Sequence, residues 1–466
     1  MGGEWQTVRL GDLVSHHKGF AFKSKDYRDS GHPVVRVSNF TGRSIDISGL
    51  KYLSENLASQ FKDYELKTGD VVIATVGSWP NNPASVVGKA IQVPTYTDSA
   101  LLNQNAVRLR SRSGLDQRFL FDLLKTADYQ NYIVSTAQGS ANQASITLNA
   151  IFGFEFQLPT LPEQKSIAHI LGTLDDKIEL NRQMNATLEA MAQALFKSWF
   201  VDFDPVIDNA LAAGNPIPEP LQARAQKRQA LGDKRKPLPQ EIQKQFPDRF
   251  VFSEEMGWIP EGWEESSVGE QVETTGGGTP STKEPIYWEN GTHAFCTPKD
   301  MSLLSSMVLM DTERHLTDAG VNKISSGQLP PGTVLMSSRA PIGYLAISDI
   351  PVSVNQGIIG MLPSDKYDSI FLLCWAHFNI GKIEDRANGS TFLEISKKNF
   401  RPIPFVVPGD SLLDAFNDQA QAIYDKLLLT AERTESLTRL RDTLLPKLLS
   451  GELRIPDAEK ILEQAL

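Results

Sequence analysis

The sequence predicts an α+β protein in which two mixed, β-rich domains are joined by two long helices that form an antiparallel coiled coil, with pseudo-twofold symmetry. Three observations lead to this prediction. The chain of 466 residues repeats its own motifs at an offset near 250 residues. Each copy contains short β-branched and aromatic stretches separated by Gly, Pro, Asn and Asp. Each copy is followed by a long segment in which apolar residues recur at heptad spacing.

The internal repeat can be followed through several pairs of motifs. Trp5 lies six residues before Gly11, and Trp263 lies six residues before Gly269. Further pairs follow in the same order, namely residues 66–72 with 329–335, 102–105 with 354–357, 137–140 with 387–390, and 152–159 with 402–408. Because a chain of this length is expected to hold several domains, we interpret the two copies as two globular units.

Helices are predicted at a few places outside the two long segments. Each copy contains one helical piece, near residues 118–132 in the first and 369–383 in the second. The stretch between the first long helix and the second copy is rich in proline and is predicted to be a linker, with a short helix around residues 220–231. The order globule, helix, linker, globule, helix follows.

The two long segments carry matching coiled-coil seams. The seam predicted in the first helix comprises Leu171, Leu174, Ile178, Asn181, Asn185, Leu188 and Leu195. The seam predicted in the second comprises Ile423, Leu427, Thr430, Thr434, Leu437 and Leu444. Polar seam residues fix register and partner choice at a cost in stability, so the coinciding polar positions indicate that the helices pack on each other. The alternative is that each helix packs on its own globule, and Arg441 fits the seam least well.

The composition excludes several classes of protein. Hydrophobic residues make up 41% and charged residues 22% of the chain, as in folded globular proteins. We find no apolar run long enough to span a membrane and no leader-like start, and we expect the protein in the cytoplasm. Cys296 and Cys374 are too few for a disulfide framework or a cysteine-based zinc site, so no metal is expected.

The charge distribution restricts where a nucleic acid could bind. The net charge is −10, which argues against a simple nucleic-acid coat protein. Residues 1–158 hold 16 Lys and Arg against 14 Asp and Glu, whereas residues 259–408 hold 11 against 17. Any surface that binds DNA must therefore be local.

Motifs of common catalytic sites are missing from the sequence. We find no phosphate-binding Gly-rich loop, no His-Glu-x-x-His zinc motif, and neither the Gly-rich cofactor turn nor the Asn/Asp-Pro-Pro-aromatic loop of adenine methyltransferases. A nuclease would require a cluster of carboxylates and Lys around a metal, and Asp70 and Asp98 lack a partner motif. The sequence predicts a protein without catalytic activity that binds no cofactor.

Several motifs together resemble the specificity subunit of type I restriction-modification enzymes, over nearly the whole chain. They are residues 161–165 at the start of the first long helix, 444–453 at the end of the second, and 277–281, 339–343 and 355–357 in the second copy. The first copy departs from this pattern at residues 18–22, where Lys-Gly-Phe-Ala-Phe stands in place of Gly-Gly-Thr-Pro-Ser.

The resemblance implies a domain organisation and a set of partners. It implies target-recognition domains at residues 1–160 and 258–408, conserved spacer helices at 161–201 and 409–452, a linker at 202–257 and a C-terminal tail at 453–466. Each domain would read one half of a split, asymmetric site in double-stranded DNA. The helices would dock two methyltransferase subunits, through which restriction subunits join, and S-adenosylmethionine is expected in the methyltransferase subunits.

Polar loops beside glycine turns are the candidate DNA contacts, because Arg, Lys, Asn and Gln read bases while Ser, Thr and Lys commonly hold phosphates. In the first copy we predict Lys18, Lys23, Lys25, Arg36, Ser38, Asn39, Ser78, Trp79, Asn103, Gln104, Gln138, Ser140, Asn142 and Gln143. In the second we predict Thr279, Ser281, Lys283, Tyr287, Thr297, Lys299, Ser337, Ser338, Arg339, Asn355, Gln356, Asn388, Ser390 and Thr391.

A second function remains open at this point. A two-headed antirestriction decoy, or a protein-binding adaptor without DNA specificity of its own, would have the same architecture. The surplus of acidic residues favours this alternative. Sequence-selective retention of DNA by a complex with the methyltransferase would exclude it.

Overall fold

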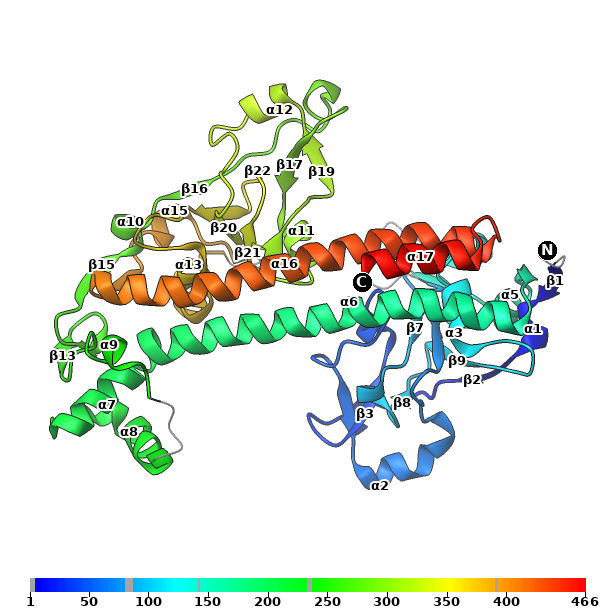
Figure 1. The fold of residues 1–466 in the computed structure, drawn as a ribbon, viewed down its shortest axis with the longest axis horizontal. Coiled ribbons are helices and arrows are strands. Elements are labelled where there is room, and N and C mark those ends of the chain that lie inside the picture. The colour runs from blue at the N-terminus through cyan, green and yellow to red at the C-terminus, as the bar shows by residue number, and fades with distance from the viewer. Residues whose placement is uncertain (1–4, 80–86, 141–142, 233–236, 390–392) are drawn as a thin grey trace. The chain divides into compact units, whose positions relative to one another are not determined.

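The structure, a computed structural model, describes residues 5–79, 87–140, 143–232, 237–389 and 393–466 (Figure 1). The chain forms two compact units, of which the first comprises residues 1–178 and 435–466 and the second residues 179–434. Each unit contains a globular head and one half of each long helix. Across the described ranges, no helix is long and apolar enough to cross a membrane.

The head of the first unit is built on short β-strands. They form a four-stranded sheet in the order β2-β9-β5-β7, two three-stranded sheets in the orders β4-β3-β8 and β10-β11-β6, and the pair β1-β12. The strands are β1 Gln6–Arg9, β2 Val14–Lys18, β3 His32–Val35, β4 Lys51–Leu53, β5 Val71–Ala74, β6 Val76–Gly77, β7 Ala90–Gln92, β8 Leu101–Leu102, β9 Ala106–Ser111, β10 Gln138–Ser140, β11 Gln143–Ser145 and β12 Glu155–Leu158. The helices of this head are α1 Leu10–Leu13, α2 Glu55–Ala58, α3 Gln117–Leu123, α4 Ala127–Ser135 and α5 Leu148–Phe152.

The head of the second unit has a comparable arrangement. Its strands form a five-stranded sheet in the order β16-β23-β20-β21-β18, a three-stranded sheet β19-β17-β22 and the pair β15-β24. The strands are β15 Glu264–Ser267, β16 Thr274–Gly276, β17 His293–Cys296, β18 Val308–Leu309, β19 Arg314–Leu316, β20 Val334–Ser338, β21 Ile342–Ser348, β22 Val352–Val354, β23 Ile358–Met361 and β24 Pro404–Val407. The helices are α10 Val268–Gln271, α11 Pro298–Ser302, α12 Asp318–Asn322, α13 Ser369–Phe378, α14 Ile380–Asp385 and α15 Lys397–Phe400.

Each predicted helical piece in the heads is in fact two helices. In the first head Thr126 is in an extended conformation and caps α4 by accepting a hydrogen bond from the backbone N–H of Tyr129. In the second head Asn379 leaves the helical conformation, and its side-chain amide donates to the carbonyl of Trp375. Both residues compete with the helix for its own backbone groups, and the interruption follows from this.

The long helices α6 (Leu161–Phe196) and α16 (Asp410–Leu449) pack against each other in opposite directions. In the first unit the early turns of α6 pack with the late turns of α16, through the buried residues Ile167, Leu171, Leu174, Ile178, Leu437, Leu444 and Leu448. In the second unit the late turns of α6 pack with the early turns of α16, through Ala192, Phe196, Phe416, Ala420 and Leu427. The predicted α+β architecture with an antiparallel helix pair is thus confirmed.

A polar layer interrupts this packing in the second unit. Asn181, Asn185, Thr430 and Thr434 are buried. The two threonine hydroxyls donate to backbone carbonyls one turn earlier, both at 2.8 Å. By contrast, Nδ2 of Asn181 and Oδ1 of Asn185 have no hydrogen-bond partner among the described residues. A buried polar atom without a partner lowers stability, so the layer fits a role in register rather than in strength.

Arg441 lies in the seam of the first unit and is stabilised there by carboxylates. Its Nη1 is 3.0 Å from Oδ1 of Asp175 on α6, and its Nη2 is 2.7 Å from Asp442. The other oxygen of Asp175 lies 2.7 Å from Arg43, which also contacts the buried Asp122 on α3 at 2.8 Å. This chain of ion pairs joins the first head to both of its helix halves. A charge in an apolar seam is tolerated because it is paired.

The segments that follow the two long helices are folded, and each contains a short helix that begins with a proline in its first turn. After a π-helical turn, Lys197–Val201, the chain continues as α7 Asp204–Ala213, and after α16 it continues as α17 Ile455–Ala465. Both short helices have proline in the first turn and bury apolar residues in the core of their unit. The remaining elements between α7 and the second head are α8 Glu219–Leu231, α9 Gln240–Gln243, β13 Phe250–Ser253 and β14 Gly257–Pro260.

Residues 202–257, predicted as a linker, are therefore held by specific contacts. Arg224 on α8 makes two hydrogen bonds of 2.7 Å with Asp204 on α7, and Arg228 pairs with Asp208 one turn further on. The predicted helix around residues 220–231 is confirmed by α8. The sequence could not reveal the pairing, because its partners are 20 residues apart and on different helices.

Candidate nucleic-acid interface

Four loops of the second head meet at the ends of its central strands. Gly277 approaches the chain so closely that a Cβ atom there would lie 1.6 Å from the carbonyl oxygen of Val354, so only glycine fits. The backbone N–H of Ser338 donates to Gly357 at 2.8 Å, and that of Ile395 donates to Ser338 at 3.0 Å. Backbone hydrogen bonds thus hold together loops that are far apart in the sequence.

Polar side chains from these loops form what we call the second loop cluster, namely Thr279, Arg339, Asn355, Gln356 and Asn388. The hydroxyl of Thr279 donates to Oε1 of Gln356 at 2.7 Å. Oδ1 of Asn355 accepts from the backbone N–H of Gly357 at 2.9 Å. Asn388 is bridged to Glu394, and Nη1 of Arg339 lies 3.5 Å from Oε2 of the same glutamate. The structure therefore brings five of the predicted residues together.

An equivalent arrangement, the first loop cluster, occurs in the first head and comprises Lys18, Trp79, Asn103, Gln104 and Ser140. A Cβ atom on Gly19 would lie 1.9 Å from the carbonyl oxygen of Asn103, a close approach to the Asn-Gln loop comparable to that of Gly277. Nε1 of Trp79 donates to the carbonyl of Ser140 at 2.8 Å. Residues 18–22 depart from the motif of the second copy, yet Gly19, like Gly277, has no room for a Cβ atom.

The other residues predicted in the first head differ in how exposed their side chains are. Lys23, Lys25, Ser38, Gln138 and Gln143 are exposed. Asn39 is buried and accepts a hydrogen bond from the backbone N–H of Arg36, whose Nη2 donates to the carbonyl of Gly49. Ser78 is buried. Asn142 lies outside the described residues.

The remaining residues predicted in the second head are mostly engaged elsewhere. Ser281 and Lys283 are exposed, whereas Tyr287 lies beside α12 because its carbonyl accepts from the backbone of Thr317. Thr297 caps α11 together with Asp300, and Lys299 pairs with Glu313 at 2.6 Å. Ser337 and Ser338 are buried, and the hydroxyl of Ser337 bonds the backbone at Pro341 and Tyr344. Ser390 and Thr391 lie outside the described residues.

Two residues near the second loop cluster were missed by sequence reasoning. Glu394 faces Arg339, and Lys397 lies over Gly276, where a Cβ atom would be 3.4 Å from Nζ. Lys397 follows the Ala-Asn-Gly-Ser motif by a few residues, so extending that motif towards the next helix would have found both.

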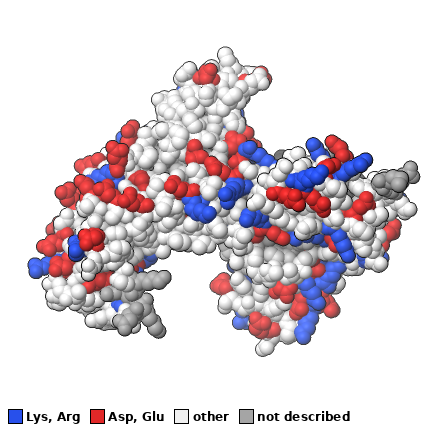
Figure 2. All heavy atoms as spheres, in the orientation of Figure 1, with Lys and Arg blue, Asp and Glu red and all other residues white. Residues whose placement is uncertain are grey.

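The surface charge supports a local rather than a global DNA surface. Over the face drawn in Figure 2, Asp and Glu predominate on the second unit, whereas Lys and Arg are interspersed with them on the first. Asp70 and Asp98, considered above as nuclease carboxylates, have other partners. Asp70 is held by two hydrogen bonds from Arg110, and hydrogen bonds from Thr68 lower the pKa of Asp98. Within the described ranges, no group of three His, Cys, Asp or Glu side chains is placed to hold a metal.

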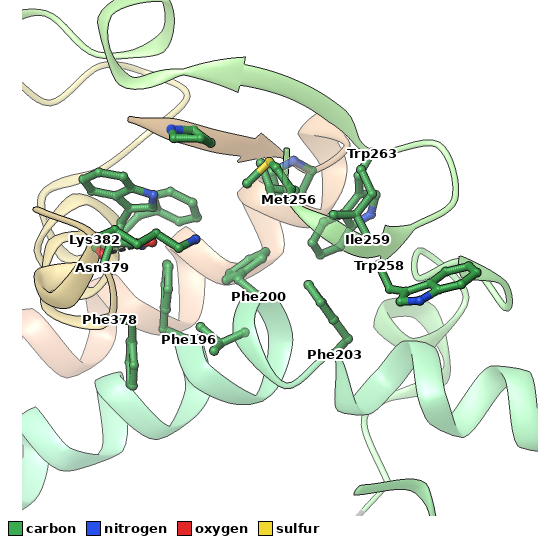
Figure 3. Close-up of a pocket in the computed structure, with 16 residues that line it drawn as sticks. Phe196, Phe200, Phe203, Met256, Trp258, Ile259, Trp263, Phe378, Asn379 and Lys382 are labelled. Carbon is green, nitrogen blue, oxygen red and sulfur yellow. Dashed lines mark hydrogen bonds between the residues drawn. The ribbon is translucent and has the colours of Figure 1, made fainter. Parts of the chain in front are cut away.

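A pocket of about 280 Å³ in the second unit is also unsuited to catalysis (Figure 3). Phe196 at the end of α6, Phe200 in the π-helical turn and Phe203 just before α7 face residues of the β13-β14 hairpin and of α13 and α14. Lys382 is the one charged side chain among the residues that line it. An acid-base pair or a metal site would need further titratable groups.

A family model described as type I restriction modification DNA specificity domain matches residues 2–190 and 260–414. The chain belongs to this family. The two matched stretches coincide with the two copies of the internal repeat, and the specificity family thus accounts for the duplicated heads.

Relatives within the specificity family come from bacteria and archaea. The type I restriction enzyme HindI specificity subunit of Haemophilus influenzae is 28% identical over 481 residues, which cover 97% of this chain and 100% of that protein. The MjaIX specificity subunit of Methanocaldococcus jannaschii is 24% identical and covers 76% of this chain and 73% of its own length. A crystal structure of an S subunit from M. genitalium aligns with a TM-score of 0.49 at 17% identity, over 95% of this chain and 96% of that one.

Membership in the specificity family defines the role of the chain in outline. It serves DNA sequence specificity in a type I restriction-modification system and is not itself a catalytic subunit. The nuclease alternative is thereby excluded, and the two loop clusters become the candidate interface with DNA.

Proposed function

We propose that the chain reads a split, asymmetric DNA site, one half with each head, and docks two methyltransferase subunits through which restriction subunits join. The observation that carries the proposal is the duplication of the loop cluster. In both heads, a glycine without room for a side chain brings an Asn-Gln loop beside a strand end. Two readers in one chain differ in sequence, and so they suit an asymmetric site in the way that two identical protomers suit a palindrome.

The chemistry of the loop clusters suits DNA. Asn, Gln and Arg side chains match the hydrogen-bonding edges of adenine and guanine, while Ser, Thr and Lys suit phosphates. The remaining predicted contacts that are exposed, such as Lys23, Lys25, Ser281 and Lys283, would hold the backbone of the duplex. The boundaries of the recognition domains and spacer helices predicted from the sequence are part of this proposal.

The helix pair supports the proposed docking of the methyltransferase. Leu180, Met184 and Met191 on α6, and Leu429 on α16, are exposed although they are large and apolar. Leu180, Met184 and Met191 recur at intervals of four and seven residues and so lie along one side of the helix. Apolar residues grouped on a helix surface commonly mark a protein interface. The methyltransferase subunits, and not this chain, would carry S-adenosylmethionine.

Methylation mapping tests the proposal. The chain is co-expressed with its methyltransferase and restriction subunits in a host without adenine methylation, and modified adenines are located across the genome. One split motif with two fixed half-sites is expected. If the subunits co-purify but no methylation appears, the proposed DNA reading is overturned and the antirestriction decoy or adaptor is favoured. The surplus of carboxylates in residues 259–408 also favours that alternative.

A pair of variants tests the docking separately. Leu180→Glu with Met191→Glu should weaken association with the methyltransferase at least tenfold, because it places charge in an apolar contact, and should leave the free chain folded. Ala186→Glu, also exposed on α6 but not three or four residues from Leu180, Met184 or Met191, is the matched control and should bind as the wild type does. Equal affinities for both variants would mean that the subunits dock elsewhere.

A further inference from the structure

Arg339 is the one described arginine of the second head whose guanidinium neither donates a hydrogen bond to a described residue nor stacks on an aromatic ring. Nε and Nη2 of Arg401 donate to Thr274, and Nη1 of Arg386 donates to the carbonyl of Pro402. The guanidinium of Arg314 lies 3.5 Å from the centre of the Trp288 ring. Arg339 has only the ion contact with Glu394, at 3.5 Å, and its side chain is 36% exposed. A guanidinium carries five N–H donors, so those of Arg339 that face neither Glu394 nor the protein are available to a ligand.

The backbone around Arg339 is fixed on both sides. The preceding residue, Ser338, accepts from Ile395 and donates to Gly357, and Arg339 itself is bridged to Glu394. Nε of Arg339 would be 3.3 Å from a Cβ atom at Gly357, so the glycine leaves space for the arginine side chain. The guanidinium therefore emerges from a rigid position, and its Nε edge faces the protein. Rigid presentation is what a base-reading side chain requires.

Backbone hydrogen bonds identify the residue of the first head that corresponds to Arg339. Thr75 donates to Asn105 and accepts from Ile146, as Ser338 does with Gly357 and Ile395. The residue after Thr75 is Val76, which pairs with Ser145 as Arg339 pairs with Glu394. Val76 and Arg339 thus occupy corresponding positions, and the Arg-Glu pair is replaced by Val and Ser. The two heads present opposite chemistry at one point of the same scaffold.

We propose that Arg339 reads a guanine in the half-site bound by the second head, that Glu394 is the residue that positions it, and that the first head with Val76 imposes no guanine at the corresponding step. This rests on the proposed function and deepens it. Guanine presents two acceptors, N7 and O6, in the major groove, and arginine is the side chain that pairs with both. Glu394 limits the rotation of the guanidinium and so directs its free edge.

The test is methylation mapping with variants of Arg339 in the complete complex. Arg339→Val, which copies the first head, is expected to abolish the requirement for guanine at one position of the second half-site. Discrimination against the other bases should fall about 10- to 100-fold there, as expected for a lost bidentate contact. All positions of the first half-site should stay unchanged. Lys323→Val removes a charge from the same head at an exposed position beside the end of α12 and should leave the motif intact.

Glu394→Gln separates positioning from charge. It keeps the length of the side chain but removes the carboxylate that faces Arg339. The motif should be preserved while discrimination for guanine falls less than in Arg339→Val. A purely structural role of Glu394 would instead lower methylation equally at every site, whatever the base.

The outcomes distinguish this inference from the proposed function. If the wild type yields no split motif, the proposed function fails. If it does, and Arg339→Val retains every base preference or relaxes the first half-site, the inference fails alone. If Arg339→Val abolishes methylation altogether, the binding of the purified variant complex to duplexes changed at single positions is measured instead. An undiminished preference for guanine at every position would overturn the inference.

Discussion

The ion pairs around Asp175 allow a quantitative test of how the first head is fixed to its helices. Asp175 accepts from Arg43 at 2.7 Å and from Arg441 at 3.0 Å, with 15% of its side chain exposed. Burial tends to lower the pKa of Arg441, but Asp175 and Asp442 outweigh this and leave it raised. Burial raises the pKa of Asp122 to about 7, against the opposing effect of Arg43. Asp175 is thus the carboxylate shared by two arginines.

Asp175→Asn removes the shared charge without changing the shape of the side chain. A hydrogen bond to a charged group contributes about 1.5–3 kcal/mol, and one of the two is lost while the other becomes weaker. Both arginines keep a second carboxylate, which places the total cost at the lower end of the range for a broken buried pair, about 3 kcal/mol. A cost of that size accelerates amide exchange through local opening about 100-fold.

Hydrogen exchange followed by mass spectrometry measures this in α3 and in the first half of α6. Asp176→Asn is the matched control, because Asp176 is the neighbouring carboxylate, pairs with Arg118 at 2.8 Å, and is 71% exposed. Its loss should cost less than about 1 kcal/mol, since exposed ion pairs contribute little. If the two variants exchange at rates within about threefold of each other, the reasoning that burial makes this pairing strong is wrong.

Three further predictions follow from close packing and from buried polar groups. Gly277→Ala should lower DNA affinity more than tenfold in a binding assay, because the added Cβ has no room. Gly278→Ala is the control and should leave the affinity unchanged, since nothing lies within 4 Å of its added Cβ. Equal affinities of the two variants would contradict the close approach of Gly277. Burial lowers the pKa of Lys125 to about 7, so above pH 7 the unfolded chain holds a proton that the folded chain lacks, and the free energy of unfolding rises with pH. In the wild type, the free energy of unfolding should rise with pH by at most about 1.4 kcal/mol per pH unit between pH 7 and 9 because of Lys125, and Lys125→Met should remove this rise. Urea unfolding of both proteins across that range measures it. If the difference between the two free energies stays constant with pH, the prediction is wrong. Asn181→Leu should raise the free energy of unfolding by about 1 kcal/mol, because it removes a buried amide nitrogen that has no partner among the described residues. A lower urea midpoint would contradict this.

Patterns that are local in the sequence allowed the helix pair to be predicted. Heptad spacing depends on residues three and four apart, and the two registers coincide, so the amino-acid sequence alone assigns Leu171 and Leu437 to a seam. The environment of Arg441 could not be predicted in this way. Its stabilisation depends on Arg43 and Asp122, which approach only when the first head folds onto α6 and α16.

The candidate site was predictable to the extent that it is repeated. The Asn-Gln loops and the Gly-Ser loops recur in both copies, and the structure brings members of each together in its own head. The pairing of Arg339 with Glu394 escaped the sequence because it arises from a bridge between two chain segments 55 residues apart. Thr297 and Ser337 have hydroxyl groups that could bind DNA, yet in the structure these groups form hydrogen bonds within the protein. The residue type alone does not reveal which of the two occurs.

An exchange of heads tests the central claim most directly. Residues 1–158 are replaced by the corresponding head of the Haemophilus influenzae relative, the chimera is co-expressed with the methyltransferase, and methylated adenines are mapped. If each head reads its own half-site, one half of the motif changes and the other half stays as in the wild type. A change in both halves, or methylation of the original motif by the chimera, would contradict the account.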